Sequence, residues 1–198
     1  MNTLLFFISA LLVIWALFFK EEKVNLGPGV MAAQTPIQEK PSSSKSFPFK
    51  GYTITPLASF EISAKVLGRE NYRLGREADL SPTDLALGWG KMSDEAVLKY
   101  IDISQSNRWY RWQTKAFPLP RREIEINSAN MHMIPKDTLV ESTLERVRKG
   151  DIVSLKGELV RVNAADGWSW VSSLSRKDTG GGACEVVFVE AMKIKDVH

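Results

Sequence analysis

The chain has 198 residues, enough for one domain with its own hydrophobic core and an additional segment. Its 26 basic and 23 acidic side chains give a formal charge of +3, which is too balanced to indicate nucleic-acid binding by itself. The single cysteine excludes an internal disulfide and a thiolate-rich zinc site, and the two histidines argue against a multi-histidine metal centre. We therefore expect neither a metal nor a cofactor.

Residues 4–19 form an uncharged apolar run that ends at the charged residues 20–23. With residues 2 and 3 included, a helix of this segment spans about 27 Å, close to a hydrocarbon core of about 30 Å. The alternatives are a buried core helix and a cleaved signal peptide, but the run lacks a basic start and a nearby small-residue cleavage site. We predict one transmembrane anchor, residues 1–20, that contacts membrane lipid through residues 3–19.

The orientation of the anchor follows from two opposing arguments. Lys20 and Lys23 follow the run and no basic side chain precedes it, so a count of Lys and Arg places the following chain in the cytoplasm. A short anchor followed by a stalk, however, suits delivery to an envelope space. We expect a single-pass protein of the bacterial inner membrane whose head lies outside the cytoplasm, with the opposite orientation as the alternative.

The residues that follow the anchor divide into two parts. Residues 21–48 are rich in Pro, Gly and Ser, which predicts a flexible linker. Residues 49–198 then form a single β-rich globular domain.

The first half of this domain mixes strand and helix signals. Ser81-Pro82 followed by Asp84 predicts a helix start, and Gly88 to Gly90 would end that helix. A second helix is predicted over residues 93–101, with Ser93 as its cap. Alternating apolar residues predict strands over residues 52–55, 60–67, 104–112 and 123–126.

The second half contains the clearest helix and then a predicted β-meander. Thr138 with Glu141 forms a capping box, and basic residues precede Gly150. Strands are predicted over residues 152–162, 168–174 and 184–190, with a polar loop between the last two. Together the elements predict an α+β, β-rich fold: a small, partly open OB- or SH3-like barrel with two or three helices.

His132 and Cys184 are the candidate catalytic pair, because a cysteine nucleophile needs a base within hydrogen-bond reach. The layout superficially resembles sortases, membrane-anchored transpeptidases with a β-barrel head. That resemblance implies His132 as acid or base and Cys184 as nucleophile. The chain departs from sortases because Cys184 follows Gly-Gly-Gly-Ala and no arginine follows Arg176. The alternative is that Cys184 packs as a small apolar side chain and His132 is an ordinary polar one.

Two further segments are candidate ligand sites. Arg176 and Lys177 precede three glycines whose N–H groups could bind an anion, although a plain hairpin tip explains the same residues. Trp168 and Trp170 share one face of a strand and could join the aromatic residues 109–112 in a platform that binds sugars, peptide or single-stranded nucleic acid. Burial of these aromatics in the core is the alternative.

Three segments carry a second resemblance. They are residues 84–90 (DLALGWG), residues 128–135 (SANMHMIP), and residues 172–185 with their SSLSR, DTG and ACE motifs. The chain from about Tyr52 onward resembles a family of membrane-anchored bacterial proteins to which no activity is assigned. The resemblance implies the architecture and a bacterial origin, and it transfers no catalytic residue.

The sequence therefore predicts a membrane-tethered, non-enzymatic binding or structural module of the bacterial envelope. An envelope protein or a glycan is the expected partner, and nucleic acid is disfavoured by the modest charge. The alternative is a thiol-dependent hydrolase or transpeptidase that uses Cys184 and His132.

Overall fold

The computed structural model describes residues 23–41, 43, 45–175, 177–178, 180 and 182–196. The predicted anchor at residues 1–20 lies outside these ranges. Within them, no helix is long and apolar enough to cross a membrane.

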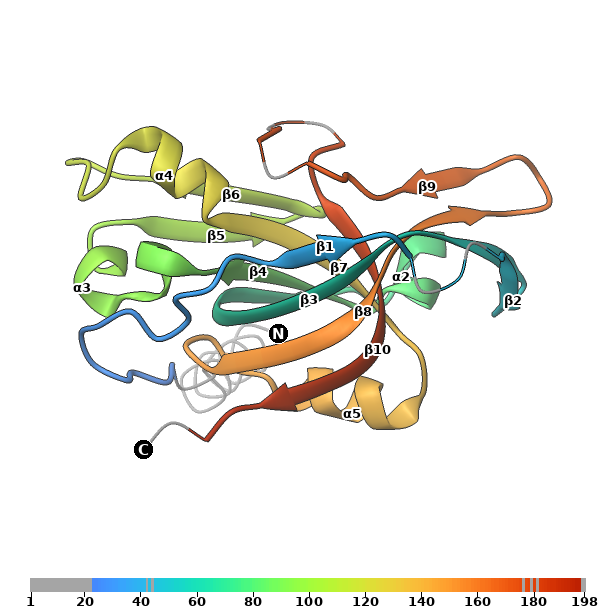
Figure 1. The fold of residues 1–198 in the computed structure, drawn as a ribbon, viewed down its shortest axis with the longest axis horizontal. Coiled ribbons are helices and arrows are strands. Elements are labelled where there is room, and N and C mark those ends of the chain that lie inside the picture. Colours follow the sequence, from blue (N-terminus) through green and yellow to red (C-terminus); the bar gives the residue numbers. More distant parts are fainter. Residues whose placement is uncertain are drawn as a thin grey trace, which may run out of the picture.

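Five strands hydrogen-bond in a ring of pairings that returns to its first member (Figure 1). They are β3 (Tyr52–Asn71), β4 (Thr83–Gly88), β7 (Ser128–Pro135), β8 (Ile152–Asn163) and β10 (Glu185–Ile194). Their order in the ring is β3, β4, β7, β10, β8, with β8 pairing back to β3. β7 and β10 run parallel, and the other pairs are antiparallel.

β3 is long enough to join two neighbours. Its C-terminal part pairs with β4, and residues 53–65 pair with β8. The register shifts between Pro56 and Ala58 and again between Val66 and Gly68. Such irregularities bend a strand and increase its twist, so one strand can follow the curvature of the ring.

Alternate residues of the ring strands form the main hydrophobic core. α5 (Thr138–Arg146) connects β7 to β8 and adds Val140 and Leu144 to this core. Asp137 caps α5 by accepting hydrogen bonds from the N–H groups of Leu139 and Val140, whereas the sequence predicted Thr138 as the cap. The core side chains include Phe60, Leu85, Leu87, Met131, Met133, Leu155, Leu159 and Val187.

The segment between β4 and β7 is an insertion that covers the outer face of these strands. It contains a 3₁₀ turn (Gly90–Ser93), α3 (Glu95–Leu98), the hairpin β5 (Asp102–Ser106) and β6 (Trp109–Gln113), and α4 (Arg121–Ile126). A separate core beneath it contains Met92, Ile124 and Ala86. α2 (Arg76–Leu80) precedes β4, so the described residues hold four α-helices and the fold is confirmed as β-rich α+β.

Two predicted elements in this region are wrong. The helix expected to start at Ser81 is β4, because all six residues of β4 are buried between β3 and β7 and sheet burial outweighs the local cap signal. The strand expected over residues 123–126 belongs to α4. Only Ile124 is buried there, and Arg121 pairs with Glu125 at 2.8 Å, which is helical spacing.

The sequence also missed β7 and misjudged the last strands. No strand is predicted over residues 128–135, yet they form β7, which lies between β4 and β10 in the ring. β9 (Ser169–Val171) and β10 are not successive members of a meander, because β10 inserts between β7 and β8. Parallel pairing of β7 with β10 joins residues distant in sequence, which no local pattern signals.

The described part of the predicted linker lies against the domain. Met31 and Ala32 donate backbone hydrogen bonds to Ser93 Oγ, and Ala32 is buried. β1 (Ile37–Glu39) and β2 (Phe47–Phe49) both pair with β3. Pro and Gly prevent a helix here, but they leave an extended segment free to pair with a sheet. This arrangement differs from the flexible linker predicted for residues 21–48.

The substitution Gly150→Ala should loosen this N-terminal segment. Gly150 has a φ of 99°, and a Cβ there would collide with the carbonyl oxygen of Val24. We expect chemical denaturation to show a loss of about 1–3 kcal/mol in the free energy of unfolding. Gly167→Ala is the matched control, since φ is 90° there but no atom lies within 4 Å of the added Cβ. Equal losses in the two variants would contradict a contribution from the Val24 contact.

Candidate functional site

A buried polar cluster surrounds Asp84 on the outer face of β4 and β7. Leu85 and Leu87 point into the main core, so the alternation of β4 directs Asp84 to the other face. The Asp84 carboxylate is fully buried and lies 2.9 Å from His132 Nδ1 and 2.6 Å from an Arg108 guanidinium nitrogen. The Asn130 amide donates a third, longer contact at 3.5 Å. The negative charge of Asp84 is therefore compensated by groups from two other elements.

Arg108 reaches this cluster from the turn of the β5–β6 hairpin. Asn107 and Arg108 both have positive φ, 51° and 66°, as a two-residue turn of the favoured type requires. Arginine is unusual in this conformation, and its contacts hold it there. Its N–H donates to the Tyr72 hydroxyl at 2.8 Å, and its guanidinium lies 3.8 Å from the centre of the Tyr72 ring. The ion pair thus fixes the hairpin onto the ring strands.

The structure places His132 and Cys184 in the same region but does not join them. His132 is buried, and its ring lies 4.8 Å from that of Trp170. Cys184 Sγ lies 4.0 Å from the Asn130 amide and 4.0 Å from the Arg108 carbonyl oxygen. Among the described residues, no hydrogen bond connects the thiol with the imidazole. Burial raises the pKa of the Cys184 thiol to about 11, which keeps it protonated at neutral pH.

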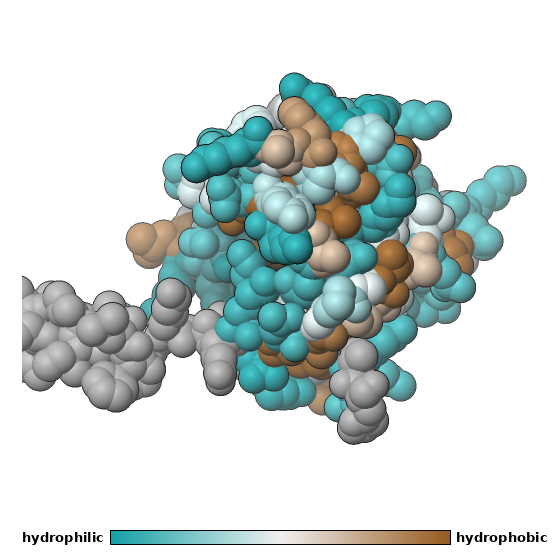
Figure 2. Space-filling model, turned by 90° about the vertical axis from the view of Figure 1, so that its left-hand side faces the viewer, coloured by the Kyte–Doolittle hydropathy of each residue, from teal (hydrophilic) through white to brown (hydrophobic). Residues whose placement is uncertain are grey.

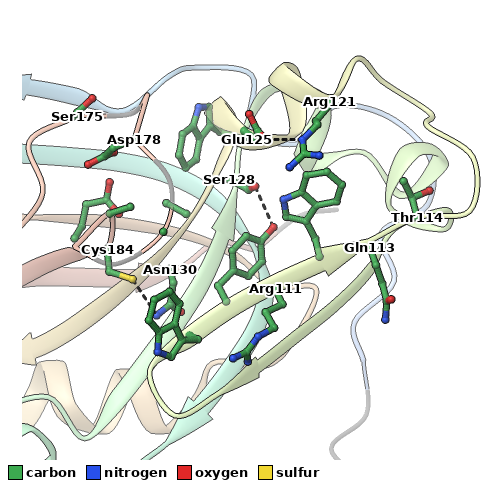
Figure 3. A pocket seen from close by; sticks show the side chains of 18 of the residues that line it. Arg111, Gln113, Thr114, Arg121, Glu125, Ser128, Asn130, Ser175, Asp178 and Cys184 are labelled. Atoms are coloured by element: carbon green, nitrogen blue, oxygen red, sulfur yellow. Dashed lines mark hydrogen bonds and ion pairs between the residues drawn. The ribbon is translucent and has the colours of Figure 1, made fainter.

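A cavity of about 610 Å³ opens beside this cluster. Asn130 and Cys184 belong to its wall, and Figure 3 shows both beside the cavity. Figure 3 also shows Ser175 and Asp178 on one side and Gln113, Thr114 and Arg121 on the other. The aromatic lining consists of Trp89, Trp109, Tyr110, Trp112 and Phe117. The charged lining consists of Arg111, Arg121, Glu125, Asp178 and Glu185.

The cavity exists because β10 does not extend alongside the first residues of β7. β10 first pairs with β7 at Glu185 opposite Met131, so residues 128–130 of β7 have no strand on that side. β6 approaches β7 where the Tyr110 hydroxyl meets Ser128 Oγ at 3.0 Å, and burial raises the pKa of Tyr110 to about 12. The space between the two strands and the loop before β10 remains open.

Three of the predicted ligand residues, Trp168, Trp170 and Lys177, are not part of the lining of this cavity. Trp168 and Trp170 are half-buried and pack against the core that contains Val162 and Phe188. Lys177 is exposed, and its carbonyl oxygen accepts hydrogen bonds from Arg122 on α4. Arg176 lies outside the described residues. The two tryptophans therefore pack largely as the alternative interpretation expected, and the aromatic residues of β6 face the cavity.

Sequence analysis missed several residues of the cluster and the cavity. Asp84 was assigned to the first turn of a helix, and Tyr72, Asn130 and Ser128 were given no role. A carboxylate within an apolar stretch, here Thr-Asp-Leu-Ala-Leu, is a signal of a buried ion pair, but its partner cannot be identified before the fold is known.

No protein-family model, curated protein or solved structure matches the chain. The resemblance to a membrane-anchored bacterial family thus stays a prediction. No group of three or more metal-ligating side chains gathers among the described residues.

Removing the carboxylate of Asp84 should be strongly destabilising. Asp84→Ala leaves Arg108 and His132 without their partner, and we expect a loss of about 3–5 kcal/mol in the free energy of unfolding, measured by denaturant titration. Glu61→Ala is the control, because Glu61 pairs with Lys156 at 2.9 Å on the exposed surface. That variant should lose less than about 1 kcal/mol. Similar small losses in both variants would contradict a structural role for Asp84.

Cys184 should react slowly while the protein is folded. The pKa of the thiol rises from its ordinary 9.0 to about 11. At pH 8 the folded chain should therefore alkylate with iodoacetamide about a hundredfold more slowly than the chain unfolded in guanidinium. The rate should increase with pH until the thiol ionises. A folded rate that equals the unfolded rate would contradict the buried thiol and would favour the nucleophile hypothesis.

Proposed function

We propose that this protein is a membrane-tethered, non-enzymatic binding module of the bacterial envelope, built on an OB-like barrel. Its ligand site is the cavity beside β6. The ligand is an extended peptide segment of a partner protein, which adds a strand to the free edge of β6. The observation that carries the proposal is that this edge is unpaired and borders an aromatic cavity.

The strand order supports an OB-like barrel. An OB fold is a five-stranded Greek-key barrel that binds ligands on its second and third strands and on the loops after its first and fourth strands. Here β3, β4, β7, β8 and β10 are the five ring strands, and α5 lies between the third and the fourth. The cavity uses the third strand and the loop after the fourth. The position of the cavity therefore agrees with where this architecture binds its ligands.

The contacts of the candidate catalytic pair favour binding over catalysis. A nucleophilic cysteine needs a lowered pKa or an adjacent base. Cys184 has a raised pKa, and the Nδ1 atom of His132 faces Asp84. The thiol enzyme is for these reasons the weaker proposal.

The geometry of the β5–β6 hairpin determines which backbone groups of β6 lie on its free edge. Ser106 and Trp109 flank the two-residue turn and form the first pair of the ladder. Hydrogen-bonded and non-hydrogen-bonded pairs alternate in an antiparallel ladder, so Tyr110 and Trp112 direct their backbone N–H and C=O groups away from β5. In the part of the chain that the structure describes, these groups have no backbone hydrogen-bond partner. All five residues of β6 line the cavity, which places the cavity along this edge.

Strand addition accounts for both the polar and the apolar features of the cavity. The free N–H and C=O groups of β6 repeat at the spacing of an extended chain and would supply affinity, and alternate side-chain sites would supply selectivity. Trp109 and Gln113 flank Arg111 on the exposed face of the hairpin. A matching peptide places an acidic side chain opposite Arg111 and apolar side chains on its neighbours, following the preferences of cross-strand pairs.

A displayed library of random decapeptides, selected against the full chain in detergent, tests the proposal. Enriched peptides should alternate in polarity and carry an acidic residue. Trp109→Ala should weaken their binding about tenfold or more, measured by calorimetry, because exposed aromatic anchors dominate such interfaces. Tyr100→Ala, which removes another exposed aromatic outside the cavity lining, is the control and should bind normally.

A second experiment tests the backbone pairing between the peptide and β6. N-methylation of the peptide amides that face β6 should abolish binding, whereas methylation of the intervening amides should not. The amide protons of Tyr110 and Trp112 should become protected from exchange in the complex. No enrichment over the Trp109→Ala chain, or binding of a neutral chito-oligosaccharide in place of any peptide, would contradict a peptide ligand.

A further inference from the structure

The described chain begins in firm contact with the domain. Lys23 Nζ lies 2.9 Å from a carboxylate oxygen of Glu95, and the backbone N–H of Val24 donates to the Lys149 carbonyl oxygen at 2.9 Å. The second carboxylate oxygen of Glu95 lies 3.0 Å from the buried Lys65. Burial alone would raise the pKa of Glu95, but the hydrogen bonds from Lys23 and Lys65 lower it, so the carboxylate stays ionised at neutral pH. Lys23 is thus fixed to the body of the domain.

This contact limits the distance between the domain and the apolar run. Only residues 20–22 separate the end of that run, Phe19, from Lys23. An extended chain spans at most about 3.6 Å per residue, so these two residues can be no more than about 15 Å apart. If the run crosses a bilayer, this distance is too short for a stalk, and the surface around Lys23 must lie at the headgroups.

The surface around Lys23 carries excess positive charge. Arg146, Arg148 and Lys149 are exposed in the last turn of α5 and the loop after it. The hydrogen bond from the Val24 N–H to the Lys149 carbonyl oxygen brings the chain at Lys23 alongside Lys149. Partial burial lowers the pKa of Lys149, and the charge of Lys23 lowers it further. We call Lys23, Lys99, Arg146, Arg148 and Lys149 the attachment face.

The acidic groups nearest to this face compensate its positive charge only in part. Asp151 is buried, accepts the backbone N–H of Arg148 and lies 3.8 Å from the Arg148 guanidinium, and Glu95 is shared between two lysines. Asp102 and Glu145 are the exposed acids nearby. Lys99 lies over the ring of the exposed Tyr100 at 4.9 Å, and lysine and tyrosine are the residue types that gather at membrane interfaces.

Figure 2 views the molecule from the end that carries α3 and the N-terminal segment. Hydrophilic residues predominate there, with smaller apolar areas between them. This character suits a surface that contacts lipid headgroups and does not enter the hydrocarbon.

We propose that the domain rests directly on the bilayer, with the attachment face against anionic lipid headgroups. This inference depends on the membrane anchor of the proposed function. Each basic side chain at such a surface adds electrostatic attraction to anionic lipid. The turn between β8 and β9 lies at the opposite end of the molecule in Figure 1 and points away from the lipid.

Energy transfer in nanodiscs tests this orientation. The full chain with Cys184→Ala carries a donor dye on Glu145→Cys, beside the attachment face, or on Ala165→Cys, in the β8–β9 turn. The acceptor is a headgroup-labelled lipid in phosphatidylcholine discs that contain phosphatidylglycerol. We expect strong transfer from residue 145 and weak transfer from residue 165. Equal or reversed transfer would overturn the proposal.

Charge-reversal variants distinguish the contact of the attachment face with lipid from membrane anchoring by residues 1–20. Arg148→Glu with Lys149→Glu keeps the Val24 hydrogen bond, because that bond uses the Lys149 backbone. This variant should still float with liposomes but lose transfer from residue 145. Arg161→Glu, an exposed arginine on β8, should change neither result. Unchanged transfer in the double variant would overturn the lipid contact alone, whereas a wild-type chain that does not float would overturn the anchor as well.

Discussion

The buried carboxylate of Asp84 is the constraint on which the rest of the site depends. A fully buried charge costs several kcal/mol unless ionic and hydrogen-bonding partners surround it. Arg108 is one of these partners, and it belongs to the turn of a hairpin inserted between β4 and β7. The ion pair therefore fixes the insertion on the outer face of the ring strands. Its consequence is positional, since it places the edge of β6 beside β7 and so defines one wall of the cavity.

The cavity itself results from a missing strand segment. In the ring, only Met131 to Met133 of β7 are paired on both sides, because β10 begins to pair at Met131 and β4 pairs no further than Met133. Two unpaired strand edges, that of β6 and that of residues 128–130, face the same space. Exposed edges are a hazard that proteins usually cover or shorten. Retaining two of them around an aromatic cavity is therefore easier to understand as a place for an incoming strand than as a defect of folding.

The sequence predicted the β-rich class, two segments of β3, strand β8 and helix α5, because each of these has a local pattern that burial then reinforces. It failed where tertiary contacts reverse the local signal. Residues 83–88 resemble a capped helix start but are enclosed by two strands, and residues 123–126 alternate like a strand but place only Ile124 inward. Cys184 was recognised as a candidate nucleophile from its residue type alone, whereas the ion pair of Asp84 with Arg108 was not predicted, because a contact between residues far apart in sequence has no local pattern.

The insertion between β4 and β7 both holds the N-terminal segment and lines the cavity. Its first residues hold the N-terminal segment: Ser93 binds residues 31 and 32, Asp94 accepts the N–H of Gly29, and Glu95 binds Lys23. Several of its later residues, among them Trp109, Phe117 and Glu125, line the cavity. Because only residues 99–101 separate α3 from β5, the point at which the chain enters the domain and the cavity wall are parts of one structural unit. If the proposed anchor holds the domain at a membrane, this unit presents the cavity in a fixed orientation, which a flexible stalk could not provide.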